Sequence, residues 1–404
     1  MAADRIVVTS IGIVTSLGTG RAAHLHALRN SQSGLRHPEI LDTIHDKEFL
    51  IGEVRQTNDA LKKTLGIQPD AEGYTRTTLL AMAGMQDILR ETDIALLNEA
   101  PLAFINANTV GGMCEVEHLY PQFIAPDADG AFTKYIETFD CGDSTERTAE
   151  FFGLKPFMAT ISTACSSSGN ALIVGARMIR QGLVKRAICG GCDAMSRFTL
   201  NGFHSLKNVD KSPCRPFDNT RFGLNLGEGA GYLLLEKESD ALARGAHIVA
   251  VFSGYSNTND AYHPTAPPPD GAGAYRTMKN ALEQANLQPA DIDYINAHGT
   301  ATLNNDVAEG RAIENLWEGT PPPFSSTKPF TGHTLAAAGA VEAIFSIWAM
   351  EEGFIPPSLN FREQMEEVRI TPTTNLQENT SLKHVLSNSF GFGGNNVSLI
   401  FSRP

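Results

Sequence analysis

Three short stretches, far apart in the chain, carry residue types suited to thioester chemistry. Cys165 stands in the run 164–169 (Ala-Cys-Ser-Ser-Ser-Gly), His298 in 297–302 (Ala-His-Gly-Thr-Ala-Thr) and His333 in 328–333 (Lys-Pro-Phe-Thr-Gly-His). A thiolate attacks acyl groups, and imidazole nitrogens donate hydrogen bonds or move protons. One cysteine with two histidines in glycine- and threonine-rich turns therefore predicts an acyl-transfer site.

The residues around Cys165 predict a strand followed by a helix that opens at the cysteine. Small residues permit a tight turn there, and apolar residues continue at positions 172, 173, 176, 178 and 179. The free amides of a helix N-terminus favour a thiolate, whereas burial alone disfavours it. An inert buried cysteine is the commoner case. The flanking Ser/Gly run is hard to explain as packing, so we favour the nucleophile.

Other polar residues lie close in sequence to each histidine. Thr300 and Thr302, two residues apart after the strand that ends at His298, face the same way and suit an extended ligand arm. A lone histidine after a strand is usually structural, but three polar groups in one turn favour a functional role. Glu342 lies in the apolar helix that follows His333 and needs a partner if buried. Lys328 is the natural candidate, unless both side chains are exposed.

A glycine-dense turn, residues 388–396, closes the chain between two strands. Glycines let backbone N–H groups approach a substrate oxygen closely. A Gly-rich hairpin is usually only a turn, so this stretch is weak evidence alone.

The elements that position these residues alternate between strands and helices, which predicts a layered α/β fold. Candidate strands form two similar series, at 5–14, 102–106, 160–163, 186–190 and 229–235, and at 247–253, 292–297, 324–326, 385–389 and 397–401. In each series the third strand leads into a small-residue helix. We therefore expect two duplicated halves, 1–245 with the cysteine and 246–404 with the histidines, joined near 242–247 in one compact unit.

Composition restricts the function classes. The formal charge of −13 argues against a nucleic-acid partner, since phosphate binding needs a basic face. The longest apolar stretch, near 340–350, is interrupted by Glu342 and is too short to span a membrane. The start lacks the apolar region of a signal peptide. We expect a cytoplasmic enzyme.

The six cysteines are too sparse for a disulfide framework. Cys189 and Cys192 match the CxxC spacing of zinc and redox sites, but no second CxxC or histidine pair completes a metal site. The alternative, a buried strand that runs into a glycine turn, is favoured. No metal is expected.

Taken together, the motifs resemble those of the elongating β-ketoacyl-acyl carrier protein synthases, condensing enzymes with a thiolase-like fold of α-β-α-β-α layers. Besides the stretches above, residues 8–15, 216–218 (Pro-Phe-Asp) and 227–231 (Gly-Glu-Gly-Ala-Gly) carry the resemblance, which spans nearly the whole chain. Initiating synthases have Asn where this chain has His333, and thiolases use a second cysteine. The chain is therefore expected to be neither an initiating synthase nor a thiolase.

The resemblance implies a role for each matched residue. Cys165 is implied as the acyl-accepting nucleophile, His298 and His333 as the pair for malonyl decarboxylation, and Lys328 with Glu342 as their support. It further implies an oxyanion hole from the amides of Cys165 and Phe392, with Phe392 as gate of the acyl pocket. The implied substrate-binding residues are Thr300, Thr302, Phe203, Gly393 and Gly394.

By the same resemblance the chain needs no cofactor, because phosphopantetheine arrives on an acyl carrier protein. Acyl and malonyl thioesters are the implied substrates, and the implied assembly is a homodimer or a heterodimer with a chain-length-factor-like subunit. A non-catalytic chain-length-factor-like subunit and a coenzyme A thioester enzyme are the alternatives, the first disfavoured by Cys165.

The chain departs from the family pattern at three places. Asn395 replaces Thr in the terminal glycine turn, and 303–305 (Leu-Asn-Asn) and 222–224 (Phe-Gly-Leu) replace other runs. These differences leave both fatty acid synthesis and a specialised polyene or polyketide pathway open, and they favour the latter.

Overall fold

The computed structural model describes residues 4–126, 130, 133 and 135–404, so residues 1–3, 127–129, 131–132 and 134 of the predicted N-terminal half lie outside the described residues. Its main sheet contains two series of strands. The first series is β1 (Ile6–Thr15), β3 (Leu102–Ala107), β4 (Phe157–Ile161), β5 (Arg186–Asp193) and β6 (Gly229–Lys237). The second is β7 (Ala250–Asn259), β8 (Tyr294–Asn296), β9 (Phe324–Ser325), β12 (His384–Phe390) and β13 (Asn395–Ser402).

The two series follow one topology. Counted within each half, the strand order is 3-2-4-5-1 in the first and its mirror image, 1-5-4-2-3, in the second, with β1 and β7 paired at the centre. In both halves strands 2, 3 and 4 are parallel, and strand 5 is antiparallel to both of its neighbours. Such a repeat is what an internal duplication produces, while the boundary at 245/246 stays a prediction.

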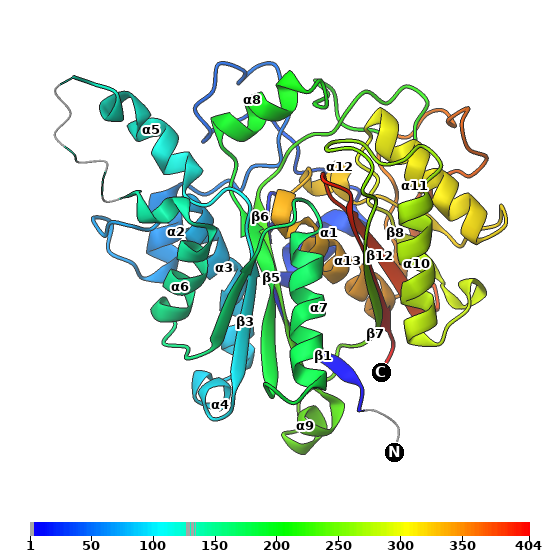
Figure 1. The fold of residues 1–404 in the computed structure, drawn as a ribbon, viewed down its shortest axis with the longest axis horizontal. Coiled ribbons are helices and arrows are strands. Elements are labelled where there is room, and N and C mark those ends of the chain that lie inside the picture. Colours follow the sequence, from blue (N-terminus) through cyan, green and yellow to red (C-terminus); the bar gives the residue numbers. More distant parts are fainter. Residues whose placement is uncertain (1–3, 127–129, 131–132, 134) are drawn as a thin grey trace.

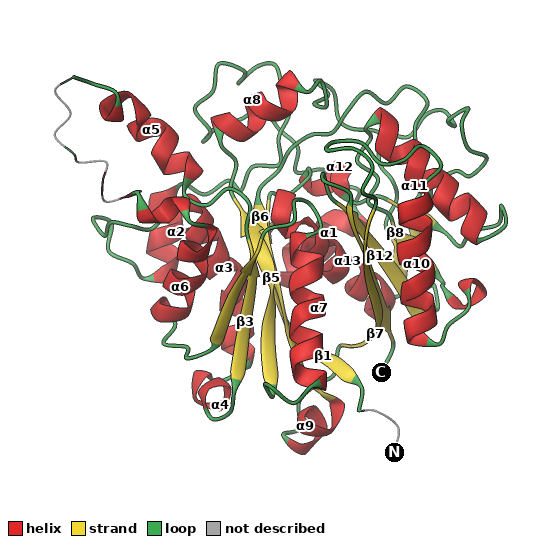
Figure 2. Cartoon of the chain, in the orientation of Figure 1, coloured by secondary structure: helices red, strands yellow, loops and turns green. Residues whose placement is uncertain are grey.

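Helices make three layers around these half-sheets, as Figures 1 and 2 show. Between the half-sheets lie α7 (Ser167–Arg180) and α13 (Ala338–Glu352), within the largest apolar cluster. Helix α3 (Arg76–Glu91) covers the first half-sheet from outside, and α10 (Ala272–Ala285) covers the second, with α11 (Leu303–Leu316) packed beside it. The predicted layered α/β architecture is therefore confirmed.

The remaining elements connect or cover these layers. The other helices are α1 (Gly20–Arg29), α2 (Asn58–Leu65), α4 (Ile94–Asn98), α5 (Met113–Phe123), α6 (Cys141–Phe151), α8 (Arg197–Ser205), α9 (Glu238–Ala243) and α12 (Lys328–Thr331). The short elements are β2 (Gly18–Thr19), β10 (Phe354–Ile355), β11 (Gln377–Glu378), η2 (Glu137–Phe139), η3 (Pro289–Asp291) and η4 (Leu335–Ala337). No helix within the described ranges is long and apolar enough to cross a membrane.

The two central helices meet at their N-terminal ends through glycines. A Cβ atom on Gly339 of α13 would lie 2.9 Å from the backbone nitrogen of Gly169 in α7, closer than packed atoms allow. Ser168 Oγ also accepts a 2.9 Å hydrogen bond from the Ala340 amide. The small residues that follow Cys165 and His333 thus let two helix ends, remote in sequence, come into contact.

Some predicted boundaries were wrong. The strand predicted at 160–163 is Phe157–Ile161, and the one predicted at 247–253 is Ala250–Asn259. Helix α7 begins at Ser167, two residues after the cysteine, because Ala164 turns the chain sharply with a φ of 54°. Cys165 therefore lies in the turn before the helix.

Candidate active site

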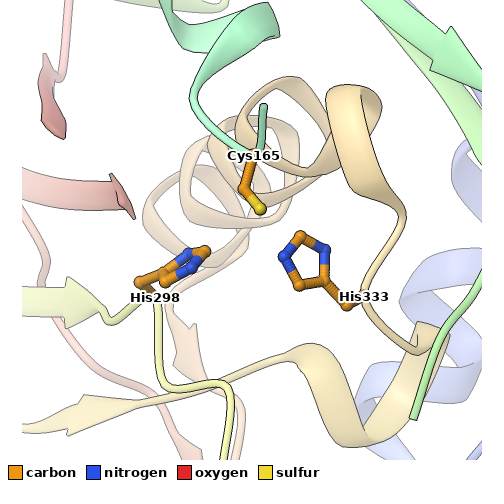
Figure 3. Close-up of side chains that lie close together, drawn as sticks. All are labelled: Cys165, His298 and His333. Carbon is orange, nitrogen blue, oxygen red and sulfur yellow. The ribbon is translucent and has the colours of Figure 1, made fainter. Parts of the chain in front are cut away.

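Cys165, His298 and His333 converge in the interior, as Figure 3 shows. The thiol sulfur and one nitrogen of each imidazole all lie within 4.8 Å of one another. The two imidazole rings are nearly perpendicular, with centroids 5.5 Å apart. All three residues are buried. The structure thus brings together the three stretches that the sequence singled out.

The surroundings of Cys165 shift the pKa of its thiol in opposite directions. Burial raises the pKa of the Cys165 thiol to about 11, while the Lys328 ammonium and the backbone amides of Phe392 and Cys165 lower this pKa. Of the two opposing influences named from the sequence, burial has the larger effect on the pKa of the thiol. At neutral pH the cysteine is therefore a thiol that loses its proton as it attacks.

Hydrogen-bond donors at Nδ1 fix the tautomers of both histidines. Lys328 Nζ lies 3.3 Å from His298 Nδ1, and the Leu335 amide donates to His333 Nδ1 at 3.1 Å. Each Nδ1 accepts, so in the neutral ring the proton sits on Nε2. Burial and the Lys328 charge hold the pKa of His298 and of His333 well below the ordinary value. Both rings are neutral donors at physiological pH.

Lys328 and Glu342 form a buried ion pair, with 1% and 4% of their side chains exposed. Burial raises the pKa of the Glu342 carboxyl to about 7, although the Lys328 ammonium lowers that pKa. The second carboxylate oxygen of Glu342 has no hydrogen-bond partner among the described residues. The pair holds the ammonium against His298, as its predicted supporting role requires.

Two buried acids that the sequence analysis did not single out hold the backbone of the site. Glu309 on α11 accepts the amides of His298 and Gly299 at 2.8 Å each. Asp193, at the end of β5, accepts amides from Thr109 and from Ala336 in η4, just after His333. A carboxylate on the buried face of a helix beside a functional turn is the sequence signal that points to Glu309.

Two cavities meet at the cysteine. One, of about 150 Å³, is lined by Cys165, His298, His333, Thr300, Thr302, Phe203, Phe392, Gly393 and Gly394, among others. The hydroxyls of Thr300 and Thr302 are 2.8 Å apart. The second, about 460 Å³ and mostly apolar, shares only Cys165, Phe203 and Phe392 with the first. The rings of Phe203 and Phe392 stack with centroids 5.6 Å apart, so they stand where the two cavities adjoin.

The CxxC cysteines take no part in this site. Cys189 and Cys192 lie fully buried in β5, and burial raises the pKa of both thiols. A Cβ on Gly175 of α7 would lie 2.1 Å from the Cys189 sulfur, so this thiol fills a tight helix–strand contact. The predicted buried strand is confirmed, but the predicted glycine turn is wrong, because β5 continues to Asp193 and contains Gly190 and Gly191.

The fold, with a buried cysteine beside two neutral imidazoles, is that of a class of acyl-transferring enzymes. The family model for the N-terminal domain of β-ketoacyl synthases matches residues 3–241, and that for the C-terminal domain matches residues 249–362. A 3-oxoacyl-[acyl-carrier-protein] synthase 2 from a Synechocystis species is 33% identical, covering 99% of this chain and 98% of the relative.

Solved structures of ketosynthases superpose closely on this chain. The ishigamide ketosynthase/chain length factor superposes with a TM-score of 0.92 at 32% identity, covering 100% of both chains. The AntDE:AntF complex, a type II PKS acyl-carrier protein with its ketosynthase bound to the hexaketide, superposes with a TM-score of 0.88 at 26% identity, also covering 100% of both. The chain belongs to the β-ketoacyl synthase family and is a condensing acyltransferase with a thiolase-like fold.

Proposed function

We propose that this enzyme extends an acyl group held on Cys165 by two carbons taken from malonyl-acyl carrier protein. The observation that carries the proposal is the convergence of one thiol and two Nε2–H imidazoles in a buried cavity. The thiol suits the first half of such a reaction, acyl transfer, and the two imidazole N–H donors suit the second half, decarboxylation. The phosphopantetheine arm arrives on the carrier protein, and no step in the scheme passes through a metal or redox cofactor.

In the first half-reaction the Cys165 sulfur attacks the thioester carbonyl of an acyl carrier protein. The thiol proton passes to the departing phosphopantetheine sulfur as the bond between that sulfur and the carbonyl carbon breaks, because both imidazoles already carry Nε2–H and accept at Nδ1. We assign the oxyanion to the amides of Cys165 and Phe392, and the fact that both lower the pKa of the Cys165 thiol supports this assignment. Loss of one such donor typically costs about 10²–10³ in rate.

In the second half-reaction a malonyl thioester enters. Its carboxylate leaves as CO2, and the bonding electrons pass into an enolate whose oxygen accepts from Nε2 of His298 and His333. The enolate carbon then attacks the acyl-Cys165 carbonyl, a carbon–carbon bond forms and the sulfur leaves. Neutral rings suit this step because their N–H donors are fixed before negative charge develops on the enolate oxygen.

The two cavities supply the routes for the substrates. We assign the cavity beside Thr300 and Thr302 to the phosphopantetheine arm, with Gly393 and Gly394 on its wall. The apolar cavity beyond Phe203 and Phe392 takes the acyl chain. The stacked rings then form a gate, which supports the expected role of Phe392.

A specialised polyene or polyketide pathway is the finer proposal. Two of the three departures from the family pattern, 222–224 and 303–305, lie together on the wall of the cavity assigned to the arm. The structural relatives named as an ishigamide ketosynthase and a hexaketide-bound ketosynthase support this assignment. Fatty acid elongation is the alternative, and the chain length of products made in vitro separates the two.

A second subunit of the same fold is the proposed partner. Strand β4 lies at the end of the described sheet order, and its Phe157 and Met158 are 57% and 41% exposed. Nearby α5 and η2 expose Tyr120 and Phe139. An open strand edge beside an apolar surface invites pairing. Native mass spectrometry distinguishes a homodimer from a heterodimer with a chain-length-factor-like subunit, and a monomer would contradict the proposal.

The function is tested by incubating the purified enzyme, with its partner subunit where one exists, with acyl- and malonyl-carrier protein. We expect CO2 release, an acyl adduct on Cys165 by mass spectrometry and a product longer by two carbons. Activity with coenzyme A thioesters alone would favour the coenzyme A enzyme. A protein that forms no adduct would be a non-catalytic subunit.

A further inference from the structure

One side-chain oxygen joins the turn before α7 to the glycine turn between β12 and β13. Asn395 Oδ1 accepts from Ser166 Oγ at 2.7 Å, from Asn170 Nδ2 at 2.8 Å and from Asn257 Nδ2 at 3.0 Å. Ser166 directly follows the nucleophile. Because all three partners donate to the same atom, the orientation of the Asn395 amide is fixed.

Each of the two amide donors in this network has a second hydrogen-bond partner. The second amide hydrogen of Asn170 goes to Thr163 Oγ1 at 2.9 Å, and Asn257 also donates to Asn170 Oδ1 at 2.7 Å. Ser166 is fully buried, whereas Asn257 is exposed and has water as an alternative partner. The single Ser166 hydroxyl hydrogen has two acceptors in reach, Asn395 Oδ1 at 2.7 Å and the Thr163 carbonyl oxygen at 2.8 Å. The shorter contact, to Asn395, is the inner link of the network.

The backbone of Asn395 shapes the turn that carries Phe392. The Gly391 amide donates to the Asn395 carbonyl at 2.8 Å, and the Gly394 amide donates to the Gly391 carbonyl at 3.0 Å. A Cβ on Gly391 would lie 2.8 Å from the Thr163 carbonyl oxygen, so the two turns touch through backbone atoms.

We propose that Asn395 is a positioning residue that holds the amides of Cys165 and Phe392 at the spacing of one oxyanion hole. The inference rests on the proposed acyl transfer. These amides come from opposite halves of the chain, and the Asn395 side chain links their turns directly. The Thr that the resemblance places here ends one bond nearer the backbone, so Asn extends the acceptor further toward Ser166.

The test separates the two half-reactions. Asn395→Leu keeps the size of the side chain and removes the acceptor. We expect acylation of Cys165 by hexanoyl-carrier protein, followed by rapid-quench mass spectrometry, to slow by about tenfold to a hundredfold, less than complete loss of a donor causes. Release of CO2 from malonyl-carrier protein, which uses the histidines, should change by less than about threefold. Equal losses in both half-reactions would overturn the proposal.

Four further variants keep the test decisive if Asn395→Leu folds poorly. Ser166→Ala breaks the same link from the other side and should slow acylation selectively, and the double variant should be no slower than either single variant. Asn395→Thr brings back an acceptor oxygen one bond nearer the backbone, so its acylation rate should lie between those of Asn395→Leu and wild type. Asn257→Ala removes an exposed donor, so its acylation should fall by at most about threefold.

Each result bears on a distinct claim. Wild-type enzyme that forms no acyl adduct would overturn the proposed function itself. Wild-type enzyme that acylates normally, beside Asn395→Leu or Ser166→Ala enzyme that acylates equally fast, would overturn only the role of Asn395.

Discussion

Replacing Lys328 by methionine should separate what the buried ion pair does for folding from what it does for catalysis. Lys328 is 1% exposed, and its ammonium contacts Glu342 and Nδ1 of His298. Methionine fills similar space without a charge, so Glu342 loses its cationic partner inside the core. Removal of one member of a buried pair costs about 3–5 kcal/mol of unfolding free energy. We expect a loss of that size in urea unfolding at pH 7.5.

The same substitution should impair decarboxylation through His298. Without the ammonium at Nδ1, the proton of this imidazole is no longer confined to Nε2, and one fixed donor to the enolate is lost. A loss of about 10²–10³ in the rate of CO2 release from malonyl-carrier protein follows.

The double variant Lys328→Met/Glu342→Leu distinguishes the two effects. An apolar pair of similar volume is often as stable as the buried ion pair it replaces, so stability should return to within about 1 kcal/mol of wild type. Decarboxylation should stay low, because no donor returns to His298. Recovery of CO2 release in the double variant would refute the reasoning, as would a Lys328→Met enzyme that is as stable as wild type.

Three other predictions use the same assays. Cys165→Ala should abolish acyl-adduct formation and elongation while the thermal midpoint stays close to wild type, and undiminished elongation would contradict the nucleophile assignment. His333→Ala should slow decarboxylation more than acylation of Cys165, and equal losses would argue against a specific donor role. Because the pKa of His298 and of His333 is held well below the ordinary value, decarboxylation should be nearly constant from pH 7.5 to pH 6. A histidine with the unperturbed pKa of about 6.5 would be only about a quarter neutral at pH 6, giving roughly a fourfold fall.

Much of the site was predictable because its chemistry lies in short, unusual runs of residues. Residues around Cys165, His298 and His333 are small, so they serve tight turns and close helix contacts, such as that between Gly169 and Gly339. The layered fold was predictable too, since apolar strands and helices alternate in two series. Segment types and order are local properties, and a sequence carries them directly.

The protonation of the site was not predictable from local patterns. The pKa of the Cys165 thiol depends on burial by segments far away in the chain, which outweighs the favourable helix end. The tautomer of His333 depends on one hydrogen bond from the Leu335 amide. Asp193 escaped notice because most of its partners are backbone amides, which have no sequence signature.

The repeated topology explains why three remote stretches meet. Strands 2, 3 and 4 of each half are parallel, so their carboxyl ends, and the segments that follow them, lie at the same edge of each half-sheet. Cys165 follows β4, the third strand of the first half, and His333 follows β9, its counterpart in the second. His298 follows β8, the second strand of that half. Contact between the N-terminal ends of α7 and α13 then joins the two edges, so one half supplies Cys165 and the other both histidines.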